Sequence, residues 1–94
     1  MKRIYIAGKI TGDPGYREKF ARLAAYFEGI GHTVLNPAVL PDGMTPVEYM
    51  SICLQMMYAS DEVVFFPDWT ESKGAQIEHA LAEYCGIPVR VVGE

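Results

Sequence analysis

Short apolar runs alternate along the chain with longer segments in which apolar residues recur every three or four positions. Four such runs occur, at residues 4–7, 32–35, 63–66 and 87–92. Three segments with helical spacing separate them, at about residues 15–28, 46–59 and 74–84. The runs at 4–7 and 63–66 are apolar on both faces, which is typical of central parallel strands that are covered on both sides.

The alternation of strand and helix predicts an α/β protein: a four-stranded parallel sheet between two layers of helices, in a Rossmann- or flavodoxin-like sandwich. Right-handed crossover connections give 2-1-3-4 as the simplest strand order. In this order the strands at 4–7 and 63–66 are central neighbours, so the loops that follow them flank one crevice. Open α/β sheets bind ligands at this carboxyl edge, and we expect the functional site there.

Two of the predicted helices carry apolar positions that define their buried faces. The last helix is expected to face the sheet with Ile77, Ala80, Leu81 and Tyr84. The middle helix has a wide apolar arc made of Val47, Met50, Cys53, Leu54 and Met57. On so small a domain, this arc also predicts a homodimer or a higher homo-oligomer.

Composition narrows the class of protein. The 94 residues are 50% hydrophobic and 21% charged, which fits one globular domain spanning residues 1–94. The net charge of −4 and the lack of a lysine or arginine run argue against binding to nucleic acid polymers. No apolar run is long enough for a membrane span and no signal-peptide pattern opens the chain, so we expect no membrane partner and a cytoplasmic location. Cys53 and Cys85 lack the spacing of a zinc site or a disulfide framework, and we expect neither a metal nor another cofactor.

The chemistry of the chain gathers between Asp61 and Glu78. The strand at 63–66 is followed by a run of turn-forming residues, then by Gly74 and the start of the last helix. A strand, a polar turn and a helix in this order place backbone N–H groups and the Glu78 carboxylate, beside the first helical turn, at the carboxyl edge of the sheet. A simpler interpretation is that Glu78 only complements the helix dipole.

Two further loops belong to the same predicted edge. Residues 8–15 are glycine-rich and lie between the first strand and the first helix, where phosphates are often bound. This loop matches neither a Walker A sequence nor GxGxxG, so it is either a phosphate loop or a plain connecting turn. Residues 37–44 are rich in turn formers and form either a lid over the site or a connection.

Three motifs on these loops resemble the nucleoside 2-deoxyribosyltransferase superfamily. They are Tyr5-Ile6-Ala7-Gly8, Thr11-Gly12 and Ser72-x-Gly74-x-x-x-Glu78. Within the superfamily, the chain is most similar to the short DUF4406 group, which has YIAGxxTG near the start and WxxSxGAxxE later. It is also similar to the 2′-deoxynucleoside 5′-monophosphate N-glycosidases, which share the SxGxxxE spacing.

The resemblance implies a site in which Glu78 is the nucleophile at the anomeric carbon of a deoxyribose and Tyr5 orients its carboxylate. It implies that Ser72 and Gly74 hold a 5′-phosphate. The other phosphate-side loop then consists of Gly8, Lys9, Thr11 and Gly12. Asp68 and Trp69, in the turn before Ser72, complete the predicted substrate-binding residues. The expected ligand is a nucleoside or a nucleoside monophosphate, and the monophosphate is expected to bind more tightly.

One departure from the superfamily pattern leaves two classes of function open. Active members carry an aspartate, on the helix before the third strand, that protonates or holds the base; here Cys53 or a neighbour takes its place. Asp61 and Asp68, at the two ends of the third strand, are the nearest acids, and Asp61 is counted with the catalytic residues. The chain is then either a nucleotide N-glycosidase or deoxyribosyltransferase, or a nucleotide-binding module that has lost the base-activating acid.

Overall fold

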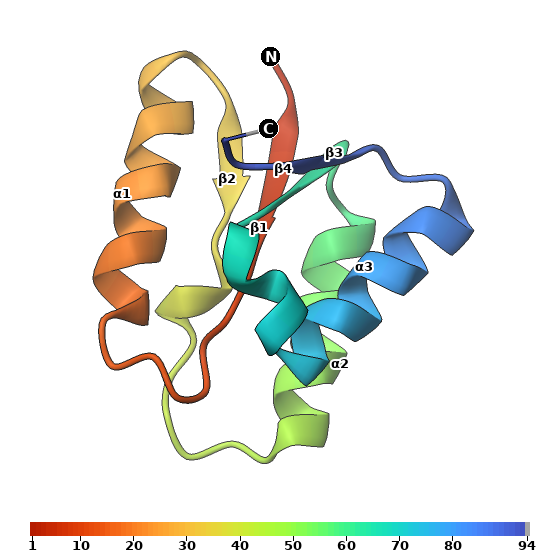
Figure 1. Ribbon diagram of the computed structural model, residues 1–94. Coiled ribbons are helices and arrows are strands. Elements are labelled where there is room, and N and C mark those ends of the chain that lie inside the picture. The colour runs from red at the N-terminus through yellow and green to blue at the C-terminus, as the bar shows by residue number, and fades with distance from the viewer. Residues whose placement is uncertain (94) are drawn as a thin grey trace.

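The computed structural model describes residues 1–93 as three layers, with helices on both faces of a parallel sheet (Figure 1). The strands are β1 (Arg3–Ala7), β2 (Thr33–Leu35), β3 (Glu62–Phe65) and β4 (Val89–Val91). The helices are α1 (Tyr16–Gly29), α2 (Pro46–Tyr58) and α3 (Lys73–Cys85). Two short 3-10 turns, η1 (Pro37–Val39) and η2 (Pro67–Glu71), follow β2 and β3. None of the helices among the described residues has the length and apolarity of a bilayer-spanning segment.

The strand order is β2-β1-β3-β4 with all neighbours parallel, which confirms the order predicted from the sequence. The central pair is β1 and β3, with Tyr5 opposite Val63 and Ala7 opposite Phe65. The loops that follow these two strands therefore start from neighbouring points on the carboxyl edge of the sheet. Side chains from both loops can reach a common site there.

Alternation along β1 and β3 divides the apolar core between the two faces of the sheet. The core under α1 contains Ile4, Ile6, Phe20, Ala24, Phe27, Val64 and Phe66. The core under α2 and α3 contains Tyr5, Ala7, Cys53, Met57, Val63, Phe65, Ala75 and Ala82. Tyr5 is fully buried in this second core, so its hydroxyl has to find a hydrogen-bond partner inside the protein.

The helix ends follow local signals that the sequence contains. Thr45 and Glu48 form a reciprocal capping box at the start of α2, with Pro46 at its first position. Ser72 caps the start of α3, and Gly86 ends that helix in the left-handed conformation with φ of 75°. Such signals explain why the elements lie close to their predicted ranges.

The buried face of α3 differs in part from the predicted one, although Leu81 packs against the core as predicted. Ile77 and Tyr84 are 49% and 89% exposed, and the helix buries Ala75, Glu78 and Ala82 instead. The two alanines let the helix backbone approach the sheet closely, which larger side chains on that face would prevent. Glu78 lies between them on the same stripe, so this close packing carries its carboxylate into the interior.

The apolar arc of α2 is divided among three surroundings. Cys53 and Met57 belong to the core. Met50 lines a cavity at the carboxyl edge of the sheet, and Val47 is 77% exposed. The arc is therefore not one free apolar surface of the kind that would support a homo-oligomer, and the oligomeric state stays a prediction.

Gly8 allows the chain to leave β1 beside the aromatic side chain of Phe66. A Cβ atom at position 8 would lie 2.9 Å from Cδ2 of Phe66 and 3.1 Å from Oδ1 of Asp68. Gly8→Ala should therefore lower the free energy of unfolding by roughly 1–3 kcal/mol, as overpacking of a filled site does, in urea denaturation. Gly29→Ala is the matched control, because a Cβ there meets nothing within 4 Å. Equal stabilities of the two variants would contradict this role of Gly8.

Candidate active site

A cavity of about 740 Å³ opens at the carboxyl edge of the sheet, where the loops after β1 and β3 meet α2. Its polar side chains come from the β1–α1 loop, the η2–α3 junction and α3, and include Thr11, Glu71, Ser72, Lys73 and Glu78. Its apolar and aromatic side chains come from α1, from the segment between β2 and α2 and from α2, and include Tyr16, Pro37, Met44, Pro46, Tyr49 and Met50. The two kinds of lining are not strictly separated, because the segment between β2 and α2 also contributes Asp42 and the β1–α1 loop also contributes Ile10.

Glu78 is the buried carboxylate of this cavity. It is 6% exposed and lines the cavity, and its Oε2 accepts a hydrogen bond from the hydroxyl of Tyr5. Tyr5 lies in β1, 73 positions earlier in the chain. The structure thus brings together two of the three residues expected to form the catalytic centre, Glu78 and Tyr5. Glu78 is the sixth residue of α3, in its second turn rather than beside its first.

Burial controls the protonation of both partners. Removal from water raises the pKa of Glu78 to about 7, and the hydrogen bond from Tyr5 acts in the opposite direction. Burial, together with the nearby charge of Glu78, raises the pKa of Tyr5 well above its ordinary value. The phenol therefore stays protonated at neutral pH and donates to the carboxylate, whereas Glu78 changes charge within the neutral range.

Cys53 adds a buried thiol to the pair formed by Tyr5 and Glu78. It is 8% exposed, lines the cavity and packs in the same core cluster as Tyr5. Burial raises the pKa of its thiol, so Cys53 is not a thiolate nucleophile at neutral pH. Cys53 and Cys85 are both free, and within residues 1–93 no three His, Cys, Asp or Glu side chains are placed to hold a metal ion.

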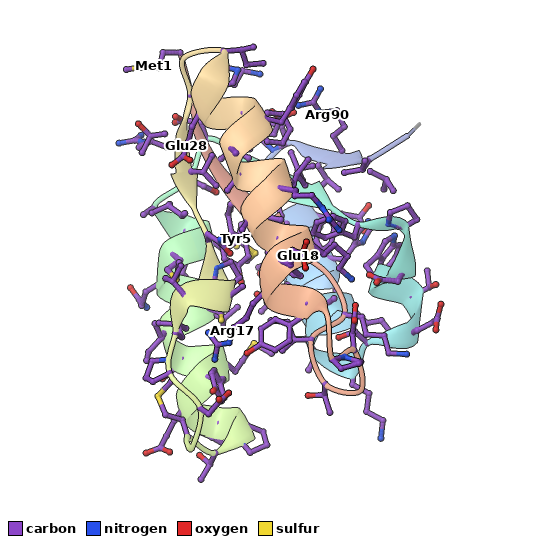
Figure 2. All side chains as sticks on the ribbon, turned by 90° about the vertical axis from the view of Figure 1, so that its left-hand side faces the viewer. Met1, Tyr5, Arg17, Glu18, Glu28 and Arg90 are labelled. Atoms are coloured by element: carbon purple, nitrogen blue, oxygen red, sulfur yellow. The ribbon has the colours of Figure 1, made fainter. Side chains whose placement is uncertain are left out.

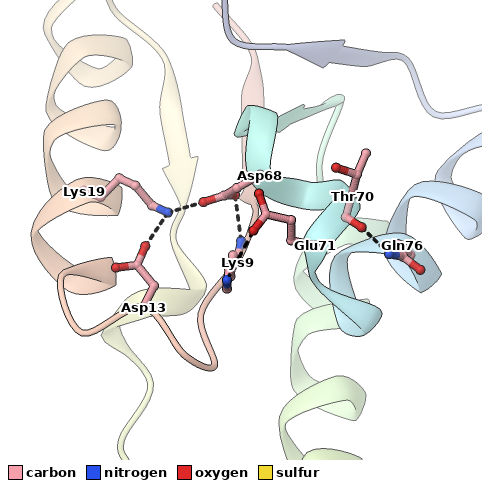
Figure 3. A network of polar contacts seen from close by, with 7 residues as sticks. All are labelled: Lys9, Asp13, Lys19, Asp68, Thr70, Glu71 and Gln76. Atoms are coloured by element: carbon pink, nitrogen blue, oxygen red, sulfur yellow. Dashed lines mark hydrogen bonds and ion pairs between the residues drawn. The ribbon is translucent and has the colours of Figure 1, made fainter.

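An ion-pair network ties the β1–α1 loop to η2 (Figure 3). Asp68 accepts a hydrogen bond from the backbone N–H of Lys9 at 3.0 Å and pairs with Lys19 at 2.7 Å. Lys19 also pairs with Asp13 at 2.7 Å. Asp68 therefore uses both of its oxygens to hold two loops together. It does not belong to the described lining of the cavity, and its predicted role in substrate binding stays a prediction.

The residues predicted to hold a phosphate are only partly brought together. Four of them line the cavity, namely Gly8, Thr11, Ser72 and Gly74. The ammonium of Lys9 instead lies 3.4 Å from the carboxylate of Glu71. Gly12 adopts a φ of 86° and shapes the turn of the loop. Among the described residues, Lys9 and Gly12 are outside the lining, and their contact with a ligand stays a prediction.

Asp61 and Trp69 have structural roles away from the cavity. Asp61 lies just before the amino end of β3, at the opposite edge of the sheet, where its carboxylate pairs with Arg3 at 3.0 Å. It cannot reach a substrate at the carboxyl edge, which corrects its predicted catalytic role. The ring of Trp69 stacks on His79 with centroids 4.0 Å apart and packs against Phe65. Trp69 therefore supports α3 and is outside the described lining of the cavity, and its predicted role in binding stays a prediction.

The chain matches one protein family over nearly its whole length. Residues 2–91 match the family model of DUF4406, described as a domain of unknown function. The chain belongs to the DUF4406 family. Searches of curated proteins and of solved structures found no match. The matched range includes Tyr5 and Glu78, so the DUF4406 domain contains the buried pair and the cavity beside it.

Residues 37–44 border the cavity of this DUF4406 domain and are held in place from α1. Arg17 donates hydrogen bonds to the carbonyls of Ala38 at 2.6 Å and Leu40 at 3.2 Å. The guanidinium of Arg17, which Figure 2 labels, also pairs with Asp42 at 3.1 Å, and Asp42 lines the cavity. The turn-rich composition of the segment left open whether it is a lid or a connection. The structure shows a bordering segment that Arg17 clamps.

Two tyrosines of the DUF4406 site were not found from the sequence. Helical spacing predicts Tyr16 to be a core residue, and it packs against the core under α1 while also lining the cavity. Tyr49 lines the cavity and donates a hydrogen bond to the carbonyl of Pro41. Periodicity shows only which side of a helix is apolar. A residue at the border of that side can serve the core and a cavity at once.

Ser72 lines the cavity and also caps α3, so loss of its hydroxyl should be visible in stability without any ligand. Its Oγ accepts a hydrogen bond from the N–H of Ala75 at 3.2 Å. Ser72→Ala should lower the free energy of unfolding by about 1 kcal/mol, the usual cost of losing an N-cap. Ser51→Ala is the control, because Ser51 is exposed within α2 and its hydroxyl donates to the carbonyl of Glu48. If Ser72→Ala proves as stable as Ser51→Ala, the cap contributes nothing.

Proposed function

We propose that this protein acts on the N-glycosidic bond of a nucleoside or nucleotide, as an N-glycosidase or a deoxyribosyltransferase. Glu78 is the nucleophile and Tyr5 orients it. The observation that carries the proposal is the Glu78 carboxylate, which is buried beside a ligand-sized cavity and accepts a hydrogen bond from Tyr5. The resemblance of the Tyr5 and Ser72–Glu78 motifs to the nucleoside 2-deoxyribosyltransferase superfamily supports the same assignment.

The lining of the cavity suits a nucleoside. Its volume of about 740 Å³ is in the range of small-molecule sites. Tyr16 and Tyr49 offer aromatic surface for a planar base, whereas Glu71 and Ser72 offer polar groups for a sugar. A nucleoside, which has a flat base and sugar hydroxyl groups, can use both kinds of lining residue.

Displacement at the anomeric carbon requires the ionised form of Glu78. In the first step, a carboxylate oxygen bonds to the anomeric carbon while the C–N bond breaks; the departing base keeps the bonding electron pair and takes a proton from solvent. In the second step, water attacks the same carbon of the glycosyl ester, releases a proton and regenerates the Glu78 carboxylate. In a transferase, a second base takes the place of water. The hydroxyl of Tyr5 keeps the carboxylate oriented in both steps.

A second candidate is a non-catalytic nucleotide-binding module. The observation that favours it is Cys53, which places a protonated thiol beside Tyr5 where an enzyme of this kind would use a carboxylic acid. Such a module would use the same cavity and leave the glycosidic bond intact.

Release of free base separates the two candidates. The protein is incubated with a panel of ribo- and deoxynucleosides and their 5′-monophosphates, and free base is measured by chromatography; a second base is added to detect transfer. Protein-dependent base release or exchange supports the enzyme. Binding in calorimetry without released base supports the module. The absence of both binding and base release would contradict both candidates.

A further inference from the structure

We propose that Glu71 makes the cavity select nucleosides without a 5′-phosphate. This inference rests on the proposed function and narrows its substrate class. It is opposite to the preference for monophosphates that the glycine-rich loop and Ser72 predict from the sequence. The reason is that Lys9, Arg17 and Lys19 already face carboxylates of the chain itself.

Glu71 takes the position relative to Lys9 and α3 that a phosphate would take. It is the last residue of η2, directly before the N-cap Ser72, and it lines the cavity. Its Oε1 lies 3.4 Å from Nζ of Lys9 (Figure 3). Lys9 and the amino end of α3 are the groups expected to attract a phosphate, and both have a negative neighbour before any ligand binds.

Lys19 and Arg17, on α1, are also paired with carboxylates. Lys19 lies 2.7 Å from both Asp13 and Asp68. Arg17 lies 3.1 Å from Asp42 and also holds two backbone carbonyls. A phosphate dianion would gain little from these side chains unless it displaced carboxylates that the fold holds in place.

The charges that line the cavity are mostly negative. Asp42, Glu71 and Glu78 line it, whereas Lys73 is the single cation in its described lining. Glu71 is paired with Lys9 and Asp42 with Arg17, so a phosphate could use either of these cations only in competition with a carboxylate. The net charge of the whole chain is −4. A dianion beside Glu71 is therefore repelled. A sugar hydroxyl can instead donate a hydrogen bond to the same carboxylate, which only accepts.

The charge of Glu71 can be removed without disturbing the fold. The side chains of Lys9 and Glu71 are 29% and 65% exposed, and exposed ion pairs add little stability. Glu71→Gln keeps the size of the side chain and leaves Lys9 as a free cation close to the cavity. The variant therefore changes the electrostatics of the site more than its shape.

Calorimetric titration of 2′-deoxynucleosides and their 5′-monophosphates tests the inference. All proteins carry Glu78→Gln, which prevents turnover during the titration. With Glu71 intact, the nucleoside should bind more tightly than its monophosphate. Glu71→Gln should raise the affinity for the monophosphate by roughly tenfold and change that for the nucleoside by less than about threefold. Glu28→Gln removes the same charge at the far end of α1 (Figure 2) and should leave both affinities unchanged.

Ionic strength gives a second measurement of the same repulsion. With Glu71 intact, added salt should strengthen binding of the monophosphate because it screens like charges. In Glu71→Gln, added salt should weaken that binding because it screens the attraction to Lys9 and Lys73. Binding of the nucleoside should respond little in either protein.

The titrations distinguish failure of the inference about Glu71 from failure of the proposed function. Tighter binding of the monophosphate with Glu71 intact would overturn the inference and leave the proposed function standing. If Glu71→Gln leaves the ratio of the affinities for nucleoside and monophosphate unchanged, the inference is also overturned and the proposed function again stands. Failure of every variant to bind either ligand would instead overturn the proposed function, and the inference with it.

Discussion

Glu78→Gln should lower the rate of N-glycosidic cleavage by roughly three orders of magnitude or more, while nucleoside binding survives. Glutamine is nearly isosteric with glutamate, and its amide oxygen can accept the hydrogen bond from Tyr5 as the carboxylate does. It lacks the negative charge that forms the bond to the anomeric carbon. Because the cavity keeps its shape, the loss should appear in kcat and not in the affinity for the ligand.

The measurement is free base released at saturating nucleoside, with affinity taken from calorimetry. Glu83→Gln is the matched control, because Glu83 lies on the same helix with a side chain that is 66% exposed and pairs with His79. This control should retain wild-type activity. Turnover by Glu78→Gln at the wild-type rate would remove Glu78 as the nucleophile, and equal losses in both variants would indicate damage to α3.

Most of the fold could be predicted because its signals are local. Residues 4–7 and 63–66 are apolar on both faces, which suits the central strands of a covered sheet, and right-handed crossovers then make the observed order the simplest one. Thr45 and Glu48 mark the start of α2 through a capping box that is visible as a sequence spacing. None of these features depends on a distant part of the chain.

The face that α3 turns to the sheet could not be predicted in this way. A hydrophobic pattern favours Ile77 and Tyr84, which are large and apolar. The helix instead approaches the sheet with Ala75 and Ala82, because small side chains permit the shorter distance. The separation between helix and sheet is a property of the whole packed molecule, and it decides that Glu78 is buried.

The site was only partly predictable for a related reason. Glu78 can be located because it follows a strand end and a helix start, which are local features. The partners of the acidic residues are distant: Asp68 pairs with Lys19 across 49 positions, and Asp61 with Arg3 across 58. In a sequence, an aspartate that binds a ligand looks the same as one that closes an ion pair.

Glu78 should also make the stability of the protein depend on pH. Folding raises its pKa from 4.5 to about 7, because burial disfavours the charged form. The folded protein therefore holds this proton more tightly than the unfolded chain. Its contribution to stability is complete below pH 4.5 and is lost as the pH rises through about 7. The loss amounts to about 3 kcal/mol, since one unit of pKa corresponds to about 1.4 kcal/mol.

Urea denaturation of wild type and Glu78→Gln from about pH 5 to about pH 9 measures this effect. Glutamine binds no proton, so the stability of the variant lacks this pH dependence. As the pH rises, the free energy of unfolding of Glu78→Gln should therefore increase by about 3 kcal/mol relative to that of wild type, and the variant should be the more stable protein at alkaline pH. Glu28→Gln gives the effect of removing a carboxylate from an exposed position. A constant difference between wild type and Glu78→Gln would contradict the burial of an ionising carboxylate.

The same ionisation should act on the proposed activity with the opposite sign. Only the carboxylate attacks the anomeric carbon, so kcat/KM of the wild type should rise through about pH 7 and level off above it. Alkaline conditions then favour the chemistry and weaken the fold, because both follow from one buried charge. The pH profiles of stability and of kcat/KM should reach their plateaus at the same pH. Plateaus that begin more than about one pH unit apart would show that a different group controls one of them.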